Sequence, residues 1–541
     1  MPSVAQLPDH AATAPVERAS SPPKSYTNPY IGIAGVFLGA GLATLNGRLL
    51  SVGLPDLRGA LGLGFDEASW LPTALSMATM FAGCFVVFLA AIYGIRRILL
   101  PAAGIFALTS FLLPLAPGYW PMLALMVIAG LTSGTFYSLT LTFVLNVLPK
   151  KLIIFGIAAY AADIVFVSNF AAGLEGWYIE HLSWHWIFWN ASVFAPVMMI
   201  CVYYGIPRQP LNKQRPNWRG FVYFSLGFAL LYGGLDQGER LYWLNSGTVV
   251  AMMAAGGLLV AASLARRVLR PNPVVSLSFL NNRNIVILGL GIIVFRFTQL
   301  ATVVLESSFL ANLRQYRPLE TGHALAWVAL PMFVVVWLVA VLIVHMDAKL
   351  VFAVGLAITA AVCWLCADID SAWAGKNFAF LELVLSVGFA CAYIGLVSSI
   401  VLAVLEAGGL TSASNAATAS GFMHFMRIFG GQVGGVFMGR FLTVREEFHS
   451  NLLGLHVQAG NWLTDDRLRT LAAGLAPLSA GPEQAQARAV GILGRQVKAQ
   501  ALTLATSDAF LLIGWMVVAY LLLMLFLKPG KVNFQMLRKM K

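Results

Sequence analysis

The sequence predicts an all-α, polytopic membrane protein with fourteen transmembrane helices. Fourteen apolar stretches are each long enough to cross a hydrocarbon core of about 30 Å, which takes about 20 helical residues. The 541-residue chain is 59% hydrophobic and 11% charged, whereas a soluble domain has about 25% charged residues. The sequence lacks the ten-residue alternating segments of a β-barrel. The spans are therefore expected to be helices, because a helix forms all the hydrogen bonds of its backbone within itself, as lipid requires.

The predicted spans cover most of the chain and are separated by polar connections. Their approximate residue numbers are 30–54, 68–92, 97–116, 119–148, 152–178, 185–206, 219–236, 246–266, 284–313, 320–346, 350–368, 376–405, 411–442 and 506–527. The segment 1–29 is polar and rich in Ala, Pro and Ser. Because it has no apolar core of a cleavable signal peptide, we expect a disordered cytoplasmic tail.

Lys and Arg residues concentrate in alternate connections, as the positive-inside rule expects of cytoplasmic loops. Arg96, Arg97, Lys150 and Lys151 fall on the same side as the basic residues of both terminal segments. The expected orientation therefore places both termini in the cytoplasm. The net charge of +12 reflects this topology and does not indicate a nucleic-acid partner.

The spans group as six, two and six. The expected units are an N-terminal six-helix bundle at 30–206, a linker with two extra transmembrane helices at 207–283, a C-terminal six-helix bundle at 284–527 and a basic cytoplasmic tail at 528–541. The long connection 443–505 is expected on the periplasmic side, where the stretches 464–475 and 482–500 could form helices outside the membrane. Solute transporters commonly repeat a six-helix half around a central site.

Motifs of catalytic and cofactor-binding proteins are missing from the sequence. The chain has no GxxxxGK[ST] phosphate-binding loop, and its His and Cys residues do not follow a metal-ligand pattern. Cys363 and Cys366 have CxxC spacing, but they lie in an apolar span without acidic or His partners. We interpret them as packing residues. We therefore expect neither an enzyme nor a bound metal or cofactor.

Six short strings stand in order along the chain. They are FDEASWLPTALSMA (65–78), WHWIFWN (184–190), LDQGERLYWLNS (235–246), NPVVSLSFLNNRN (272–284), FMRIFGGQVGG (425–435) and REEFHSNL (445–452). In this order and on this topology, the chain resembles the fourteen-span drug:proton antiporters of the major facilitator superfamily, the EmrB/QacA type, as a divergent member. The resemblance covers about residues 30–527 and implies the major facilitator fold.

The resemblance also implies a function. It implies proton-coupled efflux of small amphipathic or aromatic compounds by alternating access across a bacterial inner membrane. Members of this family in Gram-negative bacteria often work with a periplasmic adaptor and an outer-membrane channel, and the connection 443–505 lies on the side where an adaptor would dock. The alternative is a specific exporter or carrier of an anionic metabolite, siderophore or lipid-like molecule without the usual proton coupling. A non-transporting membrane sensor or scaffold is a remote alternative.

Several positions depart from the family pattern. Asn46 stands where the first span usually has an acidic residue, and Arg48 follows two residues later. Met126 stands at the position of an arginine in the fourth span. Ser168 and Ala172 occupy positions where the fifth span usually has prolines. The lost acid of the first span and the added arginines favour the anionic alternative, while the fold prediction is unaffected.

Ionisable side chains inside the predicted spans are few, and each costs about 2.5–3.5 kcal/mol at the centre of a bilayer. Asp163 lies near the middle of the fifth span, where burial among apolar residues favours its neutral form. We therefore predict Asp163 as the proton site. Arg48 is expected to pair with Asp163 or with Glu175, which lie at compatible depths. A purely structural ion pair is the alternative.

The second half of the chain supplies candidates for substrate binding. Arg296 and Arg427 could bind an anionic group of a substrate, or they could hold Glu306 and Glu382. His424 lies three residues before Arg427, so the two side chains share one helix face. The sequence does not decide between these roles.

Aromatic and glycine residues allow two interpretations each. Tyr137 and Phe166 could line an aromatic substrate cavity, with core packing as the alternative. The glycine run at 430–435 is interpreted as a close contact between helices rather than as part of a substrate site.

Overall fold

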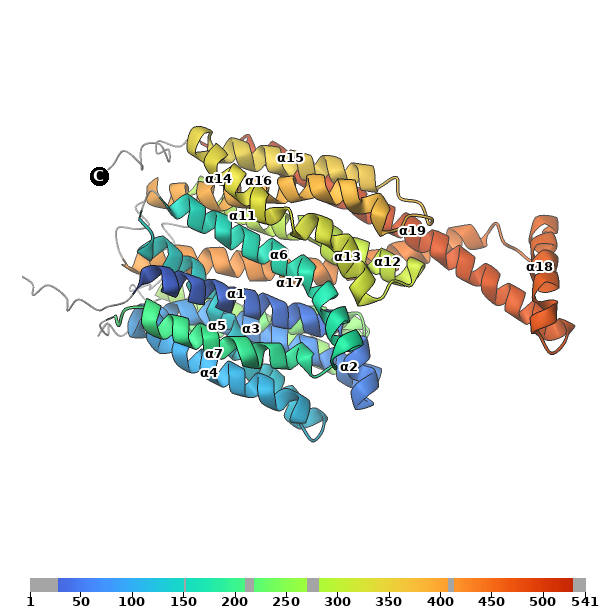
Figure 1. Ribbon diagram of the computed structural model, residues 1–541, viewed down its shortest axis with the longest axis horizontal. Helices are drawn as coiled ribbons and strands as arrows, with labels where there is room; N and C mark the ends of the chain where they lie inside the picture. The colour runs from blue at the N-terminus through green and yellow to red at the C-terminus, as the bar shows by residue number, and fades with distance from the viewer. Residues whose placement is uncertain (1–27, 150–151, 210–217, 270–281, 407–412, 529–541) are drawn as a thin grey trace, which may run out of the picture.

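The computed structural model describes residues 28–149, 152–209, 218–269, 282–406 and 413–528 (Figure 1). The predicted tails at 1–29 and 528–541 lie almost entirely outside these ranges. Every helix and turn in the described part belongs to an all-α structure, which confirms the predicted fold class.

The helices form three consecutive groups. The N-terminal block consists of α1 (Pro29–Val52), α2 (Leu54–Leu61), α3 (Phe65–Tyr93), α4 (Ile95–Leu112), α5 (Tyr119–Val147), α6 (Ile153–His181) and α7 (Trp186–Gly205). The extra pair is α8 (Trp218–Gly238) and α9 (Gly247–Leu269). The C-terminal block consists of α11 (Arg283–Thr298), the π-helical η3 (Ala301–Glu306), α12 (Ser307–Arg314), α13 (Pro318–Ala329), α14 (Met332–His345), α15 (Ala348–Cys366), α16 (Gly375–Glu406), α17 (Ala413–Gly454), α18 (Trp462–Leu475) and α19 (Pro482–Met524).

Helices occur at all fourteen positions where spans are predicted. In the described part of the chain, 12 of them are long and apolar enough to cross a membrane by length and composition. The two others are α8 and α17. Glycine, polar and charged residues lower the hydropathy of both, and α17 carries His424, Arg427 and Arg440 along its length. Composition therefore supports twelve spans, and the number fourteen stays a prediction.

Local sequence signals explain several helix ends. Asn28 caps α1 because its side chain accepts a hydrogen bond of 3.1 Å from the Tyr30 amide, and Pro29 occupies the first turn. Pro331 has no amide hydrogen and separates α13 from α14. The predicted span 320–346 is therefore built from two consecutive helices.

Buried apolar side chains form two large clusters that follow the two blocks. One cluster contains residues of α1 to α7, among them Phe106 and Phe188. The other combines α11 to α17 and α19 with much of α6 and includes Phe352 and Phe389. In Figure 1, α6 lies between α1 on one side and α13 and α14 on the other. This helix is thus the main packing contact between the blocks.

The extra pair covers the seam between the blocks on another side. Met80 of α3, Tyr232 of α8 and Ile428 of α17 form one buried cluster. The ring centroids of Phe228 and Phe425 lie 4.6 Å apart, which adds a contact between α8 and α17. The α8 helix therefore touches both blocks at once.

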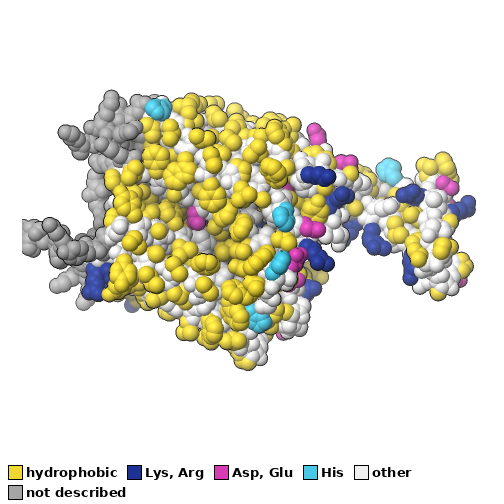
Figure 2. Space-filling view, in the orientation of Figure 1, with side chains coloured by type: hydrophobic (Ala, Val, Ile, Leu, Met, Phe, Trp, Pro, Cys, Tyr) yellow, Lys and Arg dark blue, Asp and Glu magenta, His cyan; other side chains and the backbone are white. Residues whose placement is uncertain are grey.

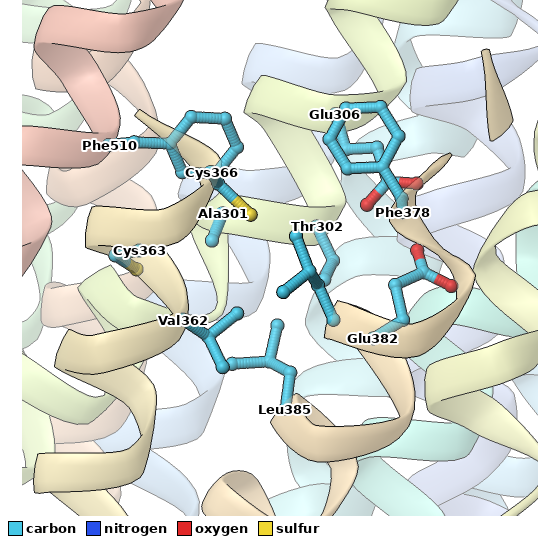
Figure 3. A pocket seen from close by; sticks show the side chains of 11 residues that line it. Ala301, Thr302, Glu306, Val362, Cys363, Cys366, Phe378, Glu382, Leu385 and Phe510 are labelled. Carbon is cyan, nitrogen blue, oxygen red and sulfur yellow. The ribbon is translucent and has the colours of Figure 1, made fainter. Parts of the chain in front are cut away.

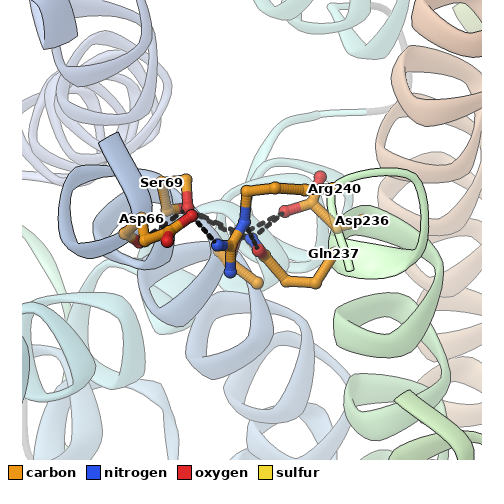
Figure 4. A network of polar contacts seen from close by, with 6 residues as sticks. Asp66, Ser69, Asp236, Gln237 and Arg240 are labelled. Atoms are coloured by element: carbon orange, nitrogen blue, oxygen red, sulfur yellow. Dashed lines mark hydrogen bonds and ion pairs between the residues drawn. The ribbon is translucent and has the colours of Figure 1, made fainter. Parts of the chain in front are cut away.

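A polar network fixes one end of α8 to α3 (Figure 4). Arg240 forms an ion pair with Asp66, and its Nε donates to Gln237 Oε1 at 2.8 Å. Gln237 in turn donates to the Ser69 carbonyl oxygen at 3.3 Å. The string LDQGERLYWLNS thus supplies the residues that hold this helix in place.

We expect Arg240→Gln to lower the thermal stability of the protein. Only 16% of the Arg240 side chain is exposed, and hydrogen bonds to a charged group contribute about 1.5–3 kcal/mol. Thermal unfolding of the detergent-purified protein measures the change. Arg467→Gln, on an exposed position of α18, is the matched control. Equal melting temperatures for the two variants would contradict a structural role for the network.

The connection 443–505 is an arm that projects beyond the other helices (Figure 1). The predicted helix at 464–475 is present as α18. The predicted helix at 482–500 is not a separate element, because α19 runs without a break from Pro482 to Met524 and includes the last span. No proline follows Pro482 within this helix, so nothing in the sequence ends it. Figure 2 shows a body covered mainly by apolar side chains, with charged side chains gathered on the arm and on the end of the body that carries it.

Candidate functional site

Charged and aromatic side chains gather where the two blocks meet. They come from α1, α5 and α6 of the N-terminal block and from α11, α16 and α17 of the C-terminal block. We call this set the central cluster, and its members are Arg48, Tyr137, Tyr160, Asp163, Arg296, Tyr393 and Arg427. The three tyrosines are buried, whereas the four charged residues are half-buried.

A row of tyrosines crosses from one block to the other. The ring centroids of Tyr137 and Tyr160 are 5.3 Å apart, and those of Tyr160 and Tyr393 are 6.1 Å apart. The side chains of Tyr160, on α6, and Tyr393, on α16, also share a hydrogen bond. Asp163 and Arg296 both interact electrostatically with these two tyrosines. One carboxyl group and one guanidinium group therefore act on the same pair of hydroxyl groups.

Asp163 presents its carboxyl group to α1. A Cβ atom at Gly41 would lie 2.9 Å from Asp163 Oδ1, so the glycine makes room for the acid. Asp163 Oδ2 is buried without a hydrogen-bond partner, and none of the ion pairs among the described residues includes Asp163. A buried carboxylate without a counter-charge is costly. A bound proton removes that cost, so this position suits a group that gains and loses a proton.

Arg48 contacts backbone carbonyl oxygens of both blocks. Its Nε donates to Ser168 at 3.4 Å and its Nη2 donates to Val303 at 3.3 Å. In this conformation it forms an ion pair neither with Asp163 nor with Glu175. Val303 belongs to the π-helical η3, a backbone geometry that is frequent at functional sites.

Arg296 and Arg427 bring two further positive charges to the cluster. Arg296 Nη1 donates to Gln299 Oε1. The guanidinium carbon of Arg427 lies 2.9 Å from the centroid of the Tyr137 ring, which is a cation–π contact between α17 and α5. The Nε atoms of both arginines are buried without an acceptor. Arg48 and Arg296 also repel one another electrostatically. The cluster therefore has unused hydrogen-bond donors and an excess of positive charge.

Glu175 lies apart from the central cluster. Its side chain is fully buried and within hydrogen-bonding reach of Asp56, at the junction of α1 and α2. A Cβ atom at Gly53 would lie 2.8 Å from Glu175 Oε1. A hydrogen bond between two carboxyl groups needs a proton between them. Glu175 thus faces another acid rather than Arg48.

The remaining candidates have different surroundings. Phe166 stacks on Phe170 with ring centroids 4.9 Å apart and lies 4.7 Å from Phe333, so it packs between α6 and α14. Asn46 is buried, and its Oδ1 has no hydrogen-bond partner. The side chain of His424 lies outside the described residues. Glu306 is buried beside Glu382 within the C-terminal block.

Comparison with known proteins decides the family. A family model described as Major Facilitator Superfamily matches residues 36–435. The chain belongs to this superfamily. It is 24% identical over 428 residues to the multidrug export protein EmrB of Haemophilus influenzae, covering 78% of this chain and 82% of the relative. It is 24% identical over 514 residues to the colistin resistance protein EmrB of Acinetobacter baumannii, covering 92% of this chain and 96% of the relative.

Solved structures of the same superfamily show the same fold. The proton:xylose symporter XylE, bound to 6-bromo-6-deoxy-D-glucose, aligns with a TM-score of 0.53 over 95% of this chain and 98% of its own, at 12% identity. As a member of the superfamily, the protein is a multi-pass membrane transporter and not an enzyme. Transporters of this superfamily place their sites at the interface of the two halves, near the bilayer midplane. The central cluster lies at this interface.

Close glycine contacts join the two halves of the transporter at a second place. A Cβ atom at Gly322 of α13 would lie 2.1 Å from the Gly173 Cα atom of α6. A Cβ atom at Gly176 would lie 2.3 Å from the Leu319 amide nitrogen. The backbones of α6 and α13 therefore touch, toward the end of the protein that carries the arm. The halves are closed against one another at this end.

The glycine run 430–435 packs against α11, which confirms the predicted helix contact. A Cβ atom at Gly430 would lie 2.9 Å from the Ile293 Cα atom, and one at Gly431 would lie 2.6 Å from Arg296 Nη2. Gly431 thus gives Arg296 the space to reach the central cluster.

Within the described residues, no group of three His, Cys, Asp or Glu side chains could hold a metal ion.

Sequence reasoning missed Tyr160 and Tyr393. Tyr160 lies three residues before Asp163 on the same face of α6, a spacing that places the two side chains together. This signal was available in the sequence. Tyr393 gives no such signal, because its partner lies on another helix far away in the chain. The transporter fold alone brings Tyr393 to Tyr160.

Proposed function

We propose that this transporter exports small amphipathic or aromatic compounds across a bacterial inner membrane in exchange for protons. The observation that carries the proposal is that Asp163 and Arg296 both interact electrostatically with the hydrogen-bonded pair Tyr160 and Tyr393, where the two halves meet. Two relatives that cover most of the chain are named as multidrug export and colistin resistance proteins, which supports export of amphipathic compounds.

The central cluster offers the groups that such an exchange needs. Tyrosine rings bind apolar and aromatic surfaces, and their hydroxyl groups bind polar ones. Asp163 has one buried oxygen without a partner and can take up a proton. Substrate and proton then compete, because a substrate seated on the tyrosines changes the surroundings of Asp163. Rocking of the halves would expose the cluster to one side of the membrane at a time.

The proposed orientation places both termini in the cytoplasm and the arm in the periplasm. Trp462, Leu463 and Leu478 of the arm are exposed apolar side chains far from the helical body. We propose this part of the arm as the contact site of a periplasmic adaptor that leads to an outer-membrane channel. The glycine contact of α6 and α13 then closes the periplasmic side, so the structure faces the cytoplasm.

Flux in proteoliposomes tests the proposed exchange. The purified protein is reconstituted with a pH-sensitive dye inside the vesicles, and an amphipathic aromatic compound is added under an imposed pH gradient. We expect substrate movement that reverses when the gradient is reversed, together with proton movement in the opposite direction. Substrate flux that is indifferent to the gradient would contradict proton coupling.

A second candidate function is transport of an amphipathic anion. It is favoured by the charges of the central cluster, which contains three arginines, Arg48, Arg296 and Arg427, and one acid, Asp163. The buried Nε atoms of Arg296 and Arg427 have no acceptor and could bind a carboxylate or phosphate group.

Arg427→Gln separates the two candidates. If the substrate is an anion, losing this donor weakens its binding by about tenfold or more, since hydrogen bonds to charged groups contribute about 1.5–3 kcal/mol. Binding of a neutral or cationic aromatic compound is expected to stay within about twofold. Fluorescence titration of the purified protein measures both. Arg314→Gln, at an exposed position of α12, is the control.

A further inference from the structure

A small cavity lies inside the C-terminal half, among η3, α15, α16 and α19 (Figure 3). Apolar side chains form most of its wall, among them Val362, Leu385 and Phe510. Glu306 and Glu382 bring two carboxyl groups to it. In Figure 3 these carboxyl groups point toward one another at one side of the cavity. The cavity is distinct from the central cluster, since neither glutamate belongs to that set.

Both glutamates are almost completely withdrawn from solvent. Each has 2% of its surface exposed. Glu306 Oε1 and both carboxyl oxygens of Glu382 are buried without a donor that could neutralise them. None of the ion pairs found in the described part of the chain includes either residue. The predicted ion pairs of Arg296 or Arg427 with these acids are therefore not formed in this structure.

The two carboxyl groups lie within hydrogen-bonding reach of one another. An ionised carboxylate only accepts hydrogen bonds, so a bond between two carboxyl groups requires one proton on the pair. Two ionised carboxylates at this distance would repel in a surrounding of low dielectric constant. The arrangement is stable when one carboxyl group donates its proton to an oxygen of the other.

The surroundings favour a proton over a metal cation as the bound species. Calcium takes about six to eight oxygen ligands, and magnesium needs a nearly ideal octahedron. Besides the two carboxyl groups, Thr302 is the oxygen-bearing side chain among the residues that line this cavity. The thiols of Cys363 and Cys366 stand on the opposite helix, but no metal-binding group of three forms among the described residues. A proton needs no coordination shell beyond the two oxygens.

The position of Glu306 connects this pair to the other half of the protein. Glu306 ends the π-helical η3, and Val303 of the same element accepts a hydrogen bond from Arg48 of α1. Arg48 is thus bound to the backbone of the turn that carries Glu306. If a change in the charge of Glu306 and Glu382 shifts η3, it acts directly on the hydrogen bond from Arg48 to Val303, which joins the two halves.

We propose that Glu306 and Glu382 form a buried proton-binding site, separate from Asp163, that holds one shared proton while Arg48 is docked on η3. Binding of this proton does not depend on the transport proposed above, whereas any part it plays in coupling rests on that function. The pair is thus a second proton-binding site of the transporter, in addition to Asp163. Loss of the proton would leave two buried negative charges and favour a different arrangement of η3.

Infrared spectroscopy of the purified protein tests the site without any transport assay. A protonated carboxyl group has a C=O stretching band that shifts in heavy water, and an ionised one lacks it. At neutral pH we expect this band in the wild type, a shifted band in Glu382→Gln and in Glu306→Gln, where the remaining buried glutamate keeps the proton, and loss of this component in the double variant Glu306→Gln/Glu382→Gln. Asp163→Asn is expected to keep that component, and so is Glu180→Gln, the matched control at an exposed position of α6.

Two results would overturn the proposal. One is a spectrum of the double variant Glu306→Gln/Glu382→Gln that equals the control while all variants elute as folded protein. The other is loss of the wild-type band on addition of sodium or potassium ions, which would show a metal cation in place of the proton. Gradient-driven flux of the wild type, measured in parallel, shows separately whether the proposed exchange function holds.

Discussion

Asp163→Asn is expected to abolish substrate accumulation against a gradient while leaving substrate exchange at equal pH intact. Asparagine keeps the shape of the side chain but cannot carry the exchanged proton. For one proton per substrate, a pH difference of one unit supports about a tenfold substrate gradient, because about 1.4 kcal/mol corresponds to a factor of ten. Accumulation and counterflow in proteoliposomes measure the two activities separately.

The control for Asp163→Asn is Glu180→Gln, which removes a carboxyl group from an exposed position of the same helix. It should accumulate substrate as the wild type does. If Asp163→Asn still accumulated substrate under the pH gradient, the exchanged proton would bind elsewhere. If it also lost counterflow, Asp163 would be needed for binding or for movement rather than for coupling alone.

Gly322→Leu is expected to hold the halves apart at the end that carries the arm and to abolish transport. A Cβ atom at this position already lies 2.1 Å from the Gly173 Cα atom, and a leucine side chain is larger. Overpacking of a close contact costs about 1–3 kcal/mol. That is enough to change a nearly balanced conformational equilibrium by about fivefold to more than a hundredfold. The closed arrangement should therefore become the minor one.

Spin labels on α6 and α12 measure this change. Labels at Glu180 and Arg314, in a background without the five native cysteines, report the separation of the halves by pulsed electron resonance. The expected distance distribution shifts to longer values in Gly322→Leu. Gly257→Leu is the control, because nothing lies within 4 Å of a Cβ atom at this exposed glycine of α9. An unchanged distribution in Gly322→Leu would show that the glycine contact does not control the closure.

The architecture could be predicted because it depends on long apolar stretches. Each span shows its length and composition in the sequence, and polar connections separate the spans. The arm shows the limit of this reasoning. Its helix at Pro482 continues into the last span, because helix-forming residues follow one another across the change from polar to apolar composition. Hydropathy locates the membrane boundary there, but not a helix end.

The candidate site was predicted less completely, because intramembrane charges do not show their partners in the sequence. Depth along the spans suggested that Arg48 meets an acid, whereas the irregular backbone of η3 offers it a carbonyl oxygen. Glu306 and Glu382 are 76 positions apart by their residue numbers, and only the packing of η3 on α16 brings them together. The same holds for Tyr393 and Tyr160.

Proton release on substrate binding is the most direct test of the role of Asp163. The detergent-purified protein is mixed with substrate in weakly buffered solution that contains a pH indicator. The wild type is expected to release protons as it binds, since substrate and proton compete at the central cluster. Asp163→Asn should bind the substrate without releasing protons. Equal proton release from Asp163→Asn and the wild type would contradict the assignment of the exchanged proton to Asp163.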